Sequence, residues 1–380
     1  MSPSPILLAR HQQCASAAAP LAVGLSPPVV LSACLALLGA GGSLLIRVYF
    51  VHGGQRLWLS TMIQVSGWPL LLPPLYFTLL LSRRDGGSSI ADRLLPPRLV
   101  GAAAVLGVLY AAACFAYSLG LQALPLSTSS LLLATQLAFN AIAAVLFAGL
   151  RFTPFSANAV VLLTIGPAVL GVGPGAGKVA GESSRAYWTG FCEAIAAAAL
   201  AGLVLPLVEV AMARYGRRTG PAARVPPPYV TVMQMQAVMG AAGTVVCLLG
   251  MAIKSDFQAL PREAATFGLG RTNYYLVLIW DAVSWQLLNL GIMGLITCAS
   301  SLLAGIMIAV LLPLSQVLSV IFLHEKFDGP KGIALVLSLW GFASYLYGEK
   351  VQKKREAQKM MEQQLALAKK TGDDLESAAL

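Results

Sequence analysis

The sequence predicts an all-α membrane protein of about ten transmembrane helices, arranged as an inverted repeat of five plus five. Three observations support this fold class: the hydrophobic content, the spacing of long apolar runs, and a weak internal repeat. Hydrophobic residues make up 57% of the 380 residues and charged residues only 11%. An ordinary soluble domain carries roughly 25% charged residues. A water-soluble fold of this length could not cover its surface with polar groups.

Ten apolar runs are long enough to cross a bilayer. Crossing about 30 Å of hydrocarbon takes about 20 residues at about 1.5 Å per helical residue. Between charged or turn-forming residues, the predicted spans are 28–50, 57–81, 98–119, 124–149, 155–173, 187–213, 229–253, 272–293, 297–323 and 330–348. Very short links, near Pro125 and near Thr297, predict tight helical hairpins between spans three and four and between spans eight and nine.

The remaining segments are polar, charged or rich in proline. Residues 1–27 contain four prolines, an Ala/Ser run and no acidic residue, which predicts a disordered cytosolic N-terminus. Residues 174–186 form a linker between a first five-helix repeat, 28–173, and a second one, 187–348. Residues 349–380 form a charged cytosolic tail, interpreted as a solvated or surface-lying helix.

The distribution of basic residues sets the orientation. With ten spans both termini lie on the same side of the membrane. Placing them in the cytosol puts most of the 26 lysines and arginines there, as the positive-inside rule requires. The net charge of +10 therefore indicates contact with a membrane surface, and no nucleic-acid partner is expected.

The residue types needed for a metal centre or a catalytic site are scarce. Five of the six cysteines fall inside apolar stretches without close pairing, so neither a disulfide nor a metal site is expected. The three histidines, His11, His52 and His324, lie outside the centres of the spans. We therefore expect no enzyme and no cofactor.

An internal repeat relates spans three to five to spans eight to ten. The pair Leu-Gly at 119–120 followed by SSLL at 129–132 recurs with the same spacing at 290–291 and 300–303. The segment after the next long helix also recurs, since Arg151, Phe152 and Pro154 correspond to Lys326, Phe327 and Pro330. With five spans in each half, the two copies cross the membrane in opposite directions, which is typical of many secondary transporters.

Several short segments in one order are similar to a known family. They are Gly41-Gly42, Arg47-Val48-Tyr49-Phe50, Gly53-Gly54-Gln55-Arg56-Leu57-Trp58, Gly67-Trp68-Pro69, Ser127-Thr128-Ser129-Ser130-Leu131, Thr135-Gln136-Leu137-Ala138-Phe139, Phe152-Thr153-Pro154-Phe155-Ser156, Trp280, Trp285-Gln286, His324-Glu325-Lys326-Phe327 and Ser338-Leu339-Trp340-Gly341-Phe342. From about Leu35 to Gly348, the chain resembles the plant purine permease family of the drug/metabolite transporter superfamily. The resemblance implies proton-coupled uptake of adenine-like bases, with cytokinins and related nitrogen heterocycles as further substrates. Gln64 departs from the family pattern, in which glutamate is frequent, and this puts a protonatable role at that position in doubt.

Two acidic residues lie well inside predicted spans, Glu193 in span six and Asp281 in span eight. An ionised side chain at mid-membrane costs about 2.5–3.5 kcal/mol, so both are candidates for proton coupling. The structural alternative for Glu193 is a hydrogen bond to a neighbouring helix.

Amide and aromatic side chains supply the candidate substrate site. A purine is flat and rimmed with donors and acceptors, so it needs a stacking face and polar groups in its plane. On span eight, Asp281, Trp285 and Asn289 follow each other at i, i+4 and i+8, and Gln286 neighbours Asn289 on the same broad face. Trp280 is the second tryptophan of this helix and is also a candidate.

A second pair of amides lies on span four. Gln136 and Asn140 are spaced i, i+4 and face one way. For both groups of residues a structural role is the alternative, because amides also link transmembrane helices and tryptophans often lie at the membrane interface.

Import by alternating access is the favoured function, with a purine or cytokinin-like molecule and a proton as the partners. The alternative is an exchanger for nucleotide sugars or phosphorylated metabolites of the same superfamily. Such an exchanger needs Lys or Arg inside the spans, and none lies clearly at mid-span. A receptor that senses the ligand without moving it is a third interpretation, which accumulation against a gradient would separate from the first. The resemblance favours the plasma membrane, with vacuolar and endoplasmic-reticulum membranes as alternatives.

Overall fold

The computed structural model describes residues 27–84, 94–148, 154–172, 184–215, 228–298 and 317–344, and single residues between 307 and 315 and between 347 and 362. All regular secondary structure in these parts is helical. Residues 1–26 of the predicted disordered N-terminus, 174–183 of the predicted linker and most of the predicted tail lie outside the described residues.

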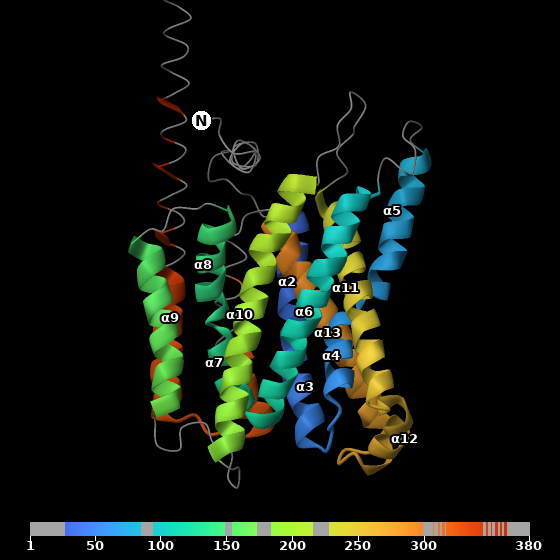
Figure 1. Ribbon diagram of the computed structural model, residues 1–380, viewed down its shortest axis with the longest axis vertical. Helices are drawn as coiled ribbons and strands as arrows, with labels where there is room; N and C mark the ends of the chain where they lie inside the picture. Colours follow the sequence, from blue (N-terminus) through green and yellow to red (C-terminus); the bar gives the residue numbers. More distant parts are fainter. Residues whose placement is uncertain are drawn as a thin grey trace, which may run out of the picture.

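Most helices run along the long axis of the molecule, and pairs such as α2 and α3 or α7 and α8 continue in one direction (Figure 1). They are α2 (Pro27–Leu38), η1 (Gly39–Gly41), α3 (Gly42–Val51), α4 (Leu57–Val65), η2 (Trp68–Leu71), α5 (Leu72–Arg84), α6 (Pro97–Ala123), α7 (Leu126–Leu133), α8 (Gln136–Ala148), α9 (Pro154–Val172), α10 (Ser184–Tyr215), α11 (Pro228–Ile253), α12 (Asp256–Thr266) and α13 (Arg271–Cys298). Residues 317–323 and 329–344 are also helical.

Six helices in the described part of the chain are long and apolar enough to cross a membrane. They are Pro27–Val51, Pro97–Ala123, Leu126–Ala143, Ser184–Met212, Val230–Ile253 and Arg271–Leu295. Each coincides with one of the ten predicted spans. The prediction of ten spans in a five-plus-five repeat is not confirmed and stays a prediction, because residues 57–84 are interrupted at η2 and span nine falls mostly on residues that are not described.

Local sequence explains where the helices break. Pro69 lies in the first turn of η2, and the α-helical part of predicted span two is interrupted there. At the end of α6, Leu124 adopts an extended conformation because the next residue is Pro125, which disfavours helical geometry in the residue before it. The predicted tight hairpin between spans three and four is therefore confirmed as the link between α6 and α7. Pro206, in contrast, lies within the continuous helix α10.

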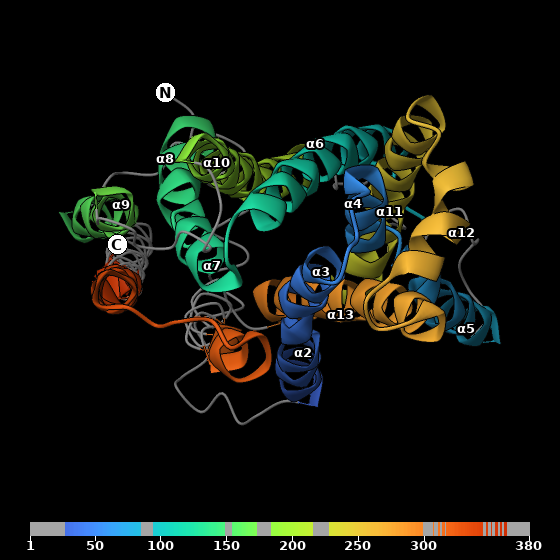
Figure 2. The same ribbon diagram turned by 90° about the horizontal axis from the view of Figure 1, so that it is seen from below.

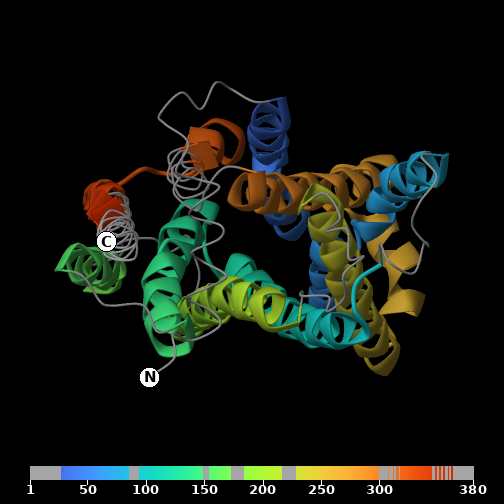
Figure 3. The ribbon, with the colours of Figure 1, turned by 90° about the horizontal axis from the view of Figure 1, so that it is seen from above.

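Seen from below and from above, the helices form a ring (Figures 2 and 3). Helix α6 packs on α10 and α11, α11 packs on α13, and α13 packs on α2 and α3. Contacts from α7 to α3 and α10 complete the ring, and α4 packs against α6, α11 and α13. Helix α9 lies at the periphery, where Asn158 donates a hydrogen bond to Ser344 at 2.9 Å.

The small residues near Gly39 allow two helices to approach closely. A Cβ atom added at Gly39 would lie 2.3 Å from the backbone nitrogen of Leu288 and 2.5 Å from the carbonyl oxygen of Ser284. Both of these residues belong to α13. The absence of a side chain at Gly39 thus brings α13 against the first transmembrane segment.

Candidate functional site

Helix α13, one of the helices that form the ring (Figure 2), carries a buried polar face. Asp281, Trp285 and Gln286 are 1%, 9% and 8% exposed, and Asn289 is half-buried. The indole of Trp285 lies directly against Gly42, since a Cβ at Gly42 would be 2.9 Å from both Cδ1 and Nε1 of the tryptophan. The helical spacing predicted from the sequence therefore does place these four side chains together.

Two tyrosines of α6 face this helix. The Tyr117 ring meets the Trp285 ring edge to face, with centroids 6.0 Å apart and an interplanar angle of 74°. The Tyr110 hydroxyl donates a hydrogen bond to Oδ1 of Asn289 at 3.1 Å. Asp281 is close enough to the Tyr117 hydroxyl to interact with it electrostatically. We call Tyr110, Tyr117, Asp281, Trp285, Gln286 and Asn289 the central cluster.

Amide groups extend the central cluster toward α4 and α11. Gln286 donates from Nε2 to Oε1 of Gln236 on α11 at 3.3 Å. A Cβ at Gly67 would lie 2.5 Å from Cβ of Gln286, so the chain just after α4 packs against that side chain. Gln64, 2% exposed, donates to the hydroxyl of Ser118 on α6 at 2.8 Å.

Three polar atoms around the central cluster are buried without a hydrogen-bond partner. They are Nε1 of Trp285, Oδ1 of Asp281 and Oε1 of Gln64. Leaving a buried donor or acceptor unpaired costs about 1–3 kcal/mol, and more for a charged group. Such atoms are rare in folded proteins. Further buried atoms elsewhere in the described part of the chain also make no hydrogen bond, among them the hydroxyl oxygens of Thr128, Ser129 and Ser338.

The other predicted site residues take no part in the hydrogen bonds and the ring contact of the central cluster. They are Trp280, Gln136, Asn140 and Glu193. Trp280 is 60% exposed and lines a shallow groove of about 350 Å³ on another face of α13. Gln136 and Asn140 lie on α8, which packs mainly on α9 and α10, and their backbone lies against Gly202 of α10. Glu193 is half-buried on α10. These residues stay predictions.

Sequence reasoning missed some residues of the site. Gln236 gave no signal, because a single glutamine in an apolar helix is not distinctive. Tyr110 and Tyr117 were equally uninformative, since tyrosine is common in such helices. Only their contacts with Asn289 and Trp285 identify them.

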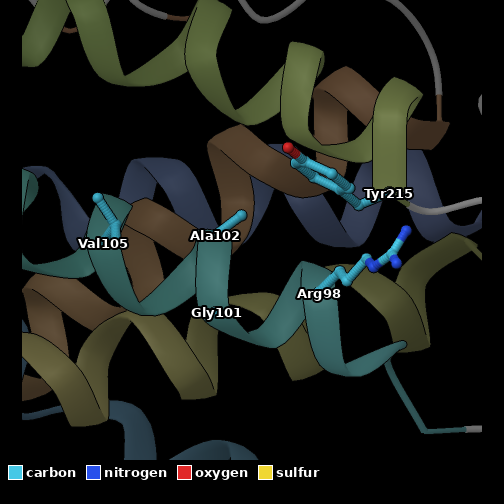
Figure 4. Close-up of a pocket in the computed structure, with 5 residues that line it drawn as sticks. All are labelled: Arg98, Gly101, Ala102, Val105 and Tyr215. Carbon is cyan, nitrogen blue, oxygen red and sulfur yellow. The ribbon is translucent and has the colours of Figure 1, made fainter.

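A second groove, of about 500 Å³, lies between one end of α6 and the end of α10 (Figure 4). Arg98, Gly101, Ala102, Val105 and Tyr215 line it, and Val105 is 70% exposed. The groove therefore opens on the outer surface, away from the central cluster. Within the described residues, no group of three or more His, Cys, Asp or Glu side chains could hold a metal ion.

Long apolar helices around buried aromatic, amide and carboxyl groups define a multi-pass helical membrane protein. A family model for purine nucleobase transmembrane transport matches residues 27–355. Purine permease 3 of Arabidopsis thaliana is 44% identical over 317 residues, which cover 83% of this chain and 88% of that protein. Purine permease 2 is 39% identical over 338 residues, covering 85% and 92%, and purine permease 21 is 34% identical over 311 residues, covering 80% and 76%. The chain therefore belongs to the purine nucleobase transmembrane transport family, and it is a transporter, not an enzyme.

Proposed function

We propose that this transporter imports purine bases and related nitrogen heterocycles, such as adenine and cytokinins, together with a proton. The observation that carries the proposal is a carboxylate and an indole N–H side by side in one buried cluster. Oδ1 of Asp281 and Nε1 of Trp285 make no hydrogen bond of ordinary geometry, although the two side chains lie close enough to interact with each other. A donor and an acceptor beside an aromatic ring match the rim and the face of a purine. Family membership supports the same substrate class.

Each part of the central cluster has a role in this proposal. Trp285 supplies the stacking face, and stacking on a base contributes about 1–3 kcal/mol. Gln286 and Asn289 supply donors and acceptors in the plane of the base. Their present partners, Gln236 and Tyr110, hold the two amides in place until the ligand enters. Gln136 and Asn140 are the second candidates for contact with the substrate.

Asp281 is the first candidate for the proton-coupling group, and Glu193 is the second. Asp281 is 1% exposed inside a candidate span, where the ionised form of a carboxylate costs about 2.5–3.5 kcal/mol. Taking up a proton with the substrate removes that cost. The carboxyl group thereby links the protonation state of the protein to the occupancy of the neighbouring Trp285.

No observation favours the nucleotide-sugar or phosphorylated-metabolite exchanger. Arg47 is a buried basic residue of a candidate span, 7% exposed. Its guanidinium donates hydrogen bonds to the carbonyl oxygens of Leu121 and Gln122, in the last turn of α6. It therefore stabilises the C-terminal end of that helix, where cations are favourable.

The proposal is tested by uptake of radiolabelled adenine into yeast cells that lack their own purine transporter. Uptake is measured at pH 5 and pH 7.5, with and without a protonophore. Acid-stimulated, protonophore-sensitive accumulation is expected, and labelled cytokinin should compete. Absence of uptake by protein shown to be at the plasma membrane, the location we propose, would exclude adenine import.

Substitutions then test the residues. Trp285→Ala should lower uptake at subsaturating adenine by about tenfold or more, which corresponds to the loss of stacking. Trp340→Ala, at a tryptophan that is 65% exposed, is the matched control and should leave uptake unchanged. Asp281→Asn should abolish acid stimulation while adenine exchange across the membrane continues. If Glu193→Gln has that effect and Asp281→Asn does not, the proton belongs to Glu193.

A further inference from the structure

Arg56, at the turn between α3 and α4, joins two carboxylates of α12. Its Nη1 atom lies 3.1 Å from Oδ1 of Asp256, and its Nε atom lies 3.3 Å from Oε2 of Glu263. The side chains of Asp256 and Glu263 are only 5% and 7% exposed. The Tyr49 and Tyr274 hydroxyls donate hydrogen bonds to Oε1 of Glu263 at 2.6 and 3.1 Å. We call these five residues the Arg56 network.

Glu325 makes a second long-range connection, to the start of α7. Its Oε1 accepts a hydrogen bond from the backbone N–H of Leu126 at 2.7 Å, and its Oε2 accepts one from the N–H of Ser127 at 3.0 Å. The Ser127 hydroxyl also donates to Oε2 at 2.6 Å. The first N–H groups of a helix lack partners within the helix, so a carboxylate at this place is strongly held.

Both connections lie at the same end of the molecule. The last residues of α5 and α10, Arg84 and Tyr215, lie at the opposite end (Figure 1). Figure 1 shows α12, the turn between α6 and α7, and residues 324–328 together at the lower end. The two ion pairs found in the described part of the chain are both at this end. Each connection joins residues that are about 200 positions apart, Arg56 with Asp256 and Leu126 with Glu325.

We propose that the Arg56 network and the contact of Glu325 with Leu126 and Ser127 form a gate that closes this end of the transport pathway. In every transport cycle the residues of each contact would separate and come together again. They connect the early part of the chain to the late part, which are the parts that must move relative to each other in alternating access. The predicted orientation makes this the external end. The structure then represents the state that is closed to the outside.

The gate is held by ion pairs and hydrogen bonds, which can break and form again in each transport cycle. The contacts are between charged and polar groups at the end of the helices, where water can solvate each partner once they part. Backbone contact reinforces the gate, since the N–H of Gly268 donates to the carbonyl oxygen of His52 at 2.9 Å. This bond joins the α3–α4 turn to the turn after α12.

A reversible cross-link tests the proposal. A Cβ added at Gly268 would lie 3.6 Å from Cβ of His52, and Cβ atoms of natural disulfides are about 3.5–4.5 Å apart. In the His52→Cys, Gly268→Cys double variant, oxidation should lower adenine uptake by about tenfold or more, and a reductant should restore it. The two single variants, treated with the same oxidant, are the controls and should keep their uptake. Undiminished uptake by the cross-linked protein would overturn the proposal.

A second measurement does not depend on the substrate. Cys114, 4% exposed, lies behind the gate, about 14 Å from the end of α6 at about 1.5 Å per residue. Its labelling by a membrane-impermeant thiol reagent, added outside intact cells, is measured by mass spectrometry. Glu263→Gln, Arg56→Gln and Glu325→Gln should each raise the labelling by roughly threefold or more. The cross-linked double variant should show none.

The controls are charged neighbours on the same segments. Arg262→Gln and Asp328→Asn change exposed residues beside Glu263 and Glu325, and their labelling should equal that of the unchanged protein. If adenine is not transported at all while labelling responds as expected, the proposed substrate fails and the gate stands. Unchanged labelling in the Glu263 and Glu325 variants would exclude the gate even if adenine is transported.

Discussion

The position of the Trp285 indole depends on Gly42, a neighbour without a side chain. Its indole fills the space that a Cβ at Gly42 would occupy, and its ring edge faces Tyr117. The buried Nε1 atom makes no hydrogen bond of ordinary geometry. The position of the proposed stacking face is therefore set by backbone on one side and by an aromatic ring on the other.

Gly42→Ala should impair transport without unfolding the protein. The added methyl group would lie 2.9 Å from two atoms of the Trp285 indole, so the ring has to move. We expect kcat/KM for purine uptake to fall about tenfold, a loss of about 1.4 kcal/mol from the stacking energy. Uptake kinetics, normalised to the amount of protein at the membrane, measure this change.

Gly41→Ala is the matched control for that substitution. A Cβ at Gly41 meets no atom within 4 Å, although Gly41 is the adjacent residue in the chain. Its kinetics should equal those of the unchanged protein. Equal kinetics for both alanine variants would show that the Trp285 position does not matter to transport.

Helix α6 is the element on which the site is built. It packs on α10 and α11, and it carries Tyr110, Tyr117 and Ser118, which contact Asn289, Trp285 and Gln64. Its close approach to α11 occurs at Gly107, where an added Cβ would lie 2.2 Å from the carbonyl oxygen of Met239. Because that neighbour is backbone, the two helices would have to separate to accept a larger residue.

Gly107→Ala should lower the thermal stability of the purified protein. Overpacking of this kind costs about 1–3 kcal/mol, so Tm in detergent should fall by several degrees. Gly101→Ala, on the same helix, meets nothing within 4 Å and removes the roughly 0.5–1 kcal/mol penalty of a helical glycine. Its Tm should stay the same or rise. A Tm for Gly107→Ala as high as that of Gly101→Ala would contradict the close α6–α11 contact.

At the scale of the whole molecule, the two ends differ in how they are held. The end with α12 has the Arg56 network and the Glu325 contact, whereas the groove of Figure 4 opens beside α6 and α10 at the other end. Helix α2 starts at the end opposite α12, and residues 329–344 finish there (Figure 1). We therefore expect an even number of crossings.

Tags at the two termini should therefore be on the same side of the membrane. With ten spans and both termini in the cytosol, antibodies should reach neither tag in intact cells and both tags after permeabilisation. A glycosylation acceptor inserted into residues 174–186 should be modified, because the predicted linker lies outside. Access to only one tag in intact cells would require an odd number of spans.

The transmembrane helices could be predicted from the sequence because each needs only a run of apolar residues of sufficient length. All six candidate spans were located this way. The grouping of four of the six central-cluster residues was also predictable: Asp281, Trp285, Gln286 and Asn289 share one helix, and spacing along a helix is a local property. Trp280 has similar chemistry, but the structure places it on another face, 60% exposed.

The sequence by itself determined that this chain is a membrane transporter with a polar face on the segment that forms α13, because composition, periodicity and family motifs are properties of the chain alone. Only the tertiary structure decided which groups face that helix, among them Gln236, Tyr110 and Tyr117, and that Arg56 and Glu325 connect distant segments at one end. Contacts between residues about 200 positions apart depend on how helices pack, and no local pattern records that packing.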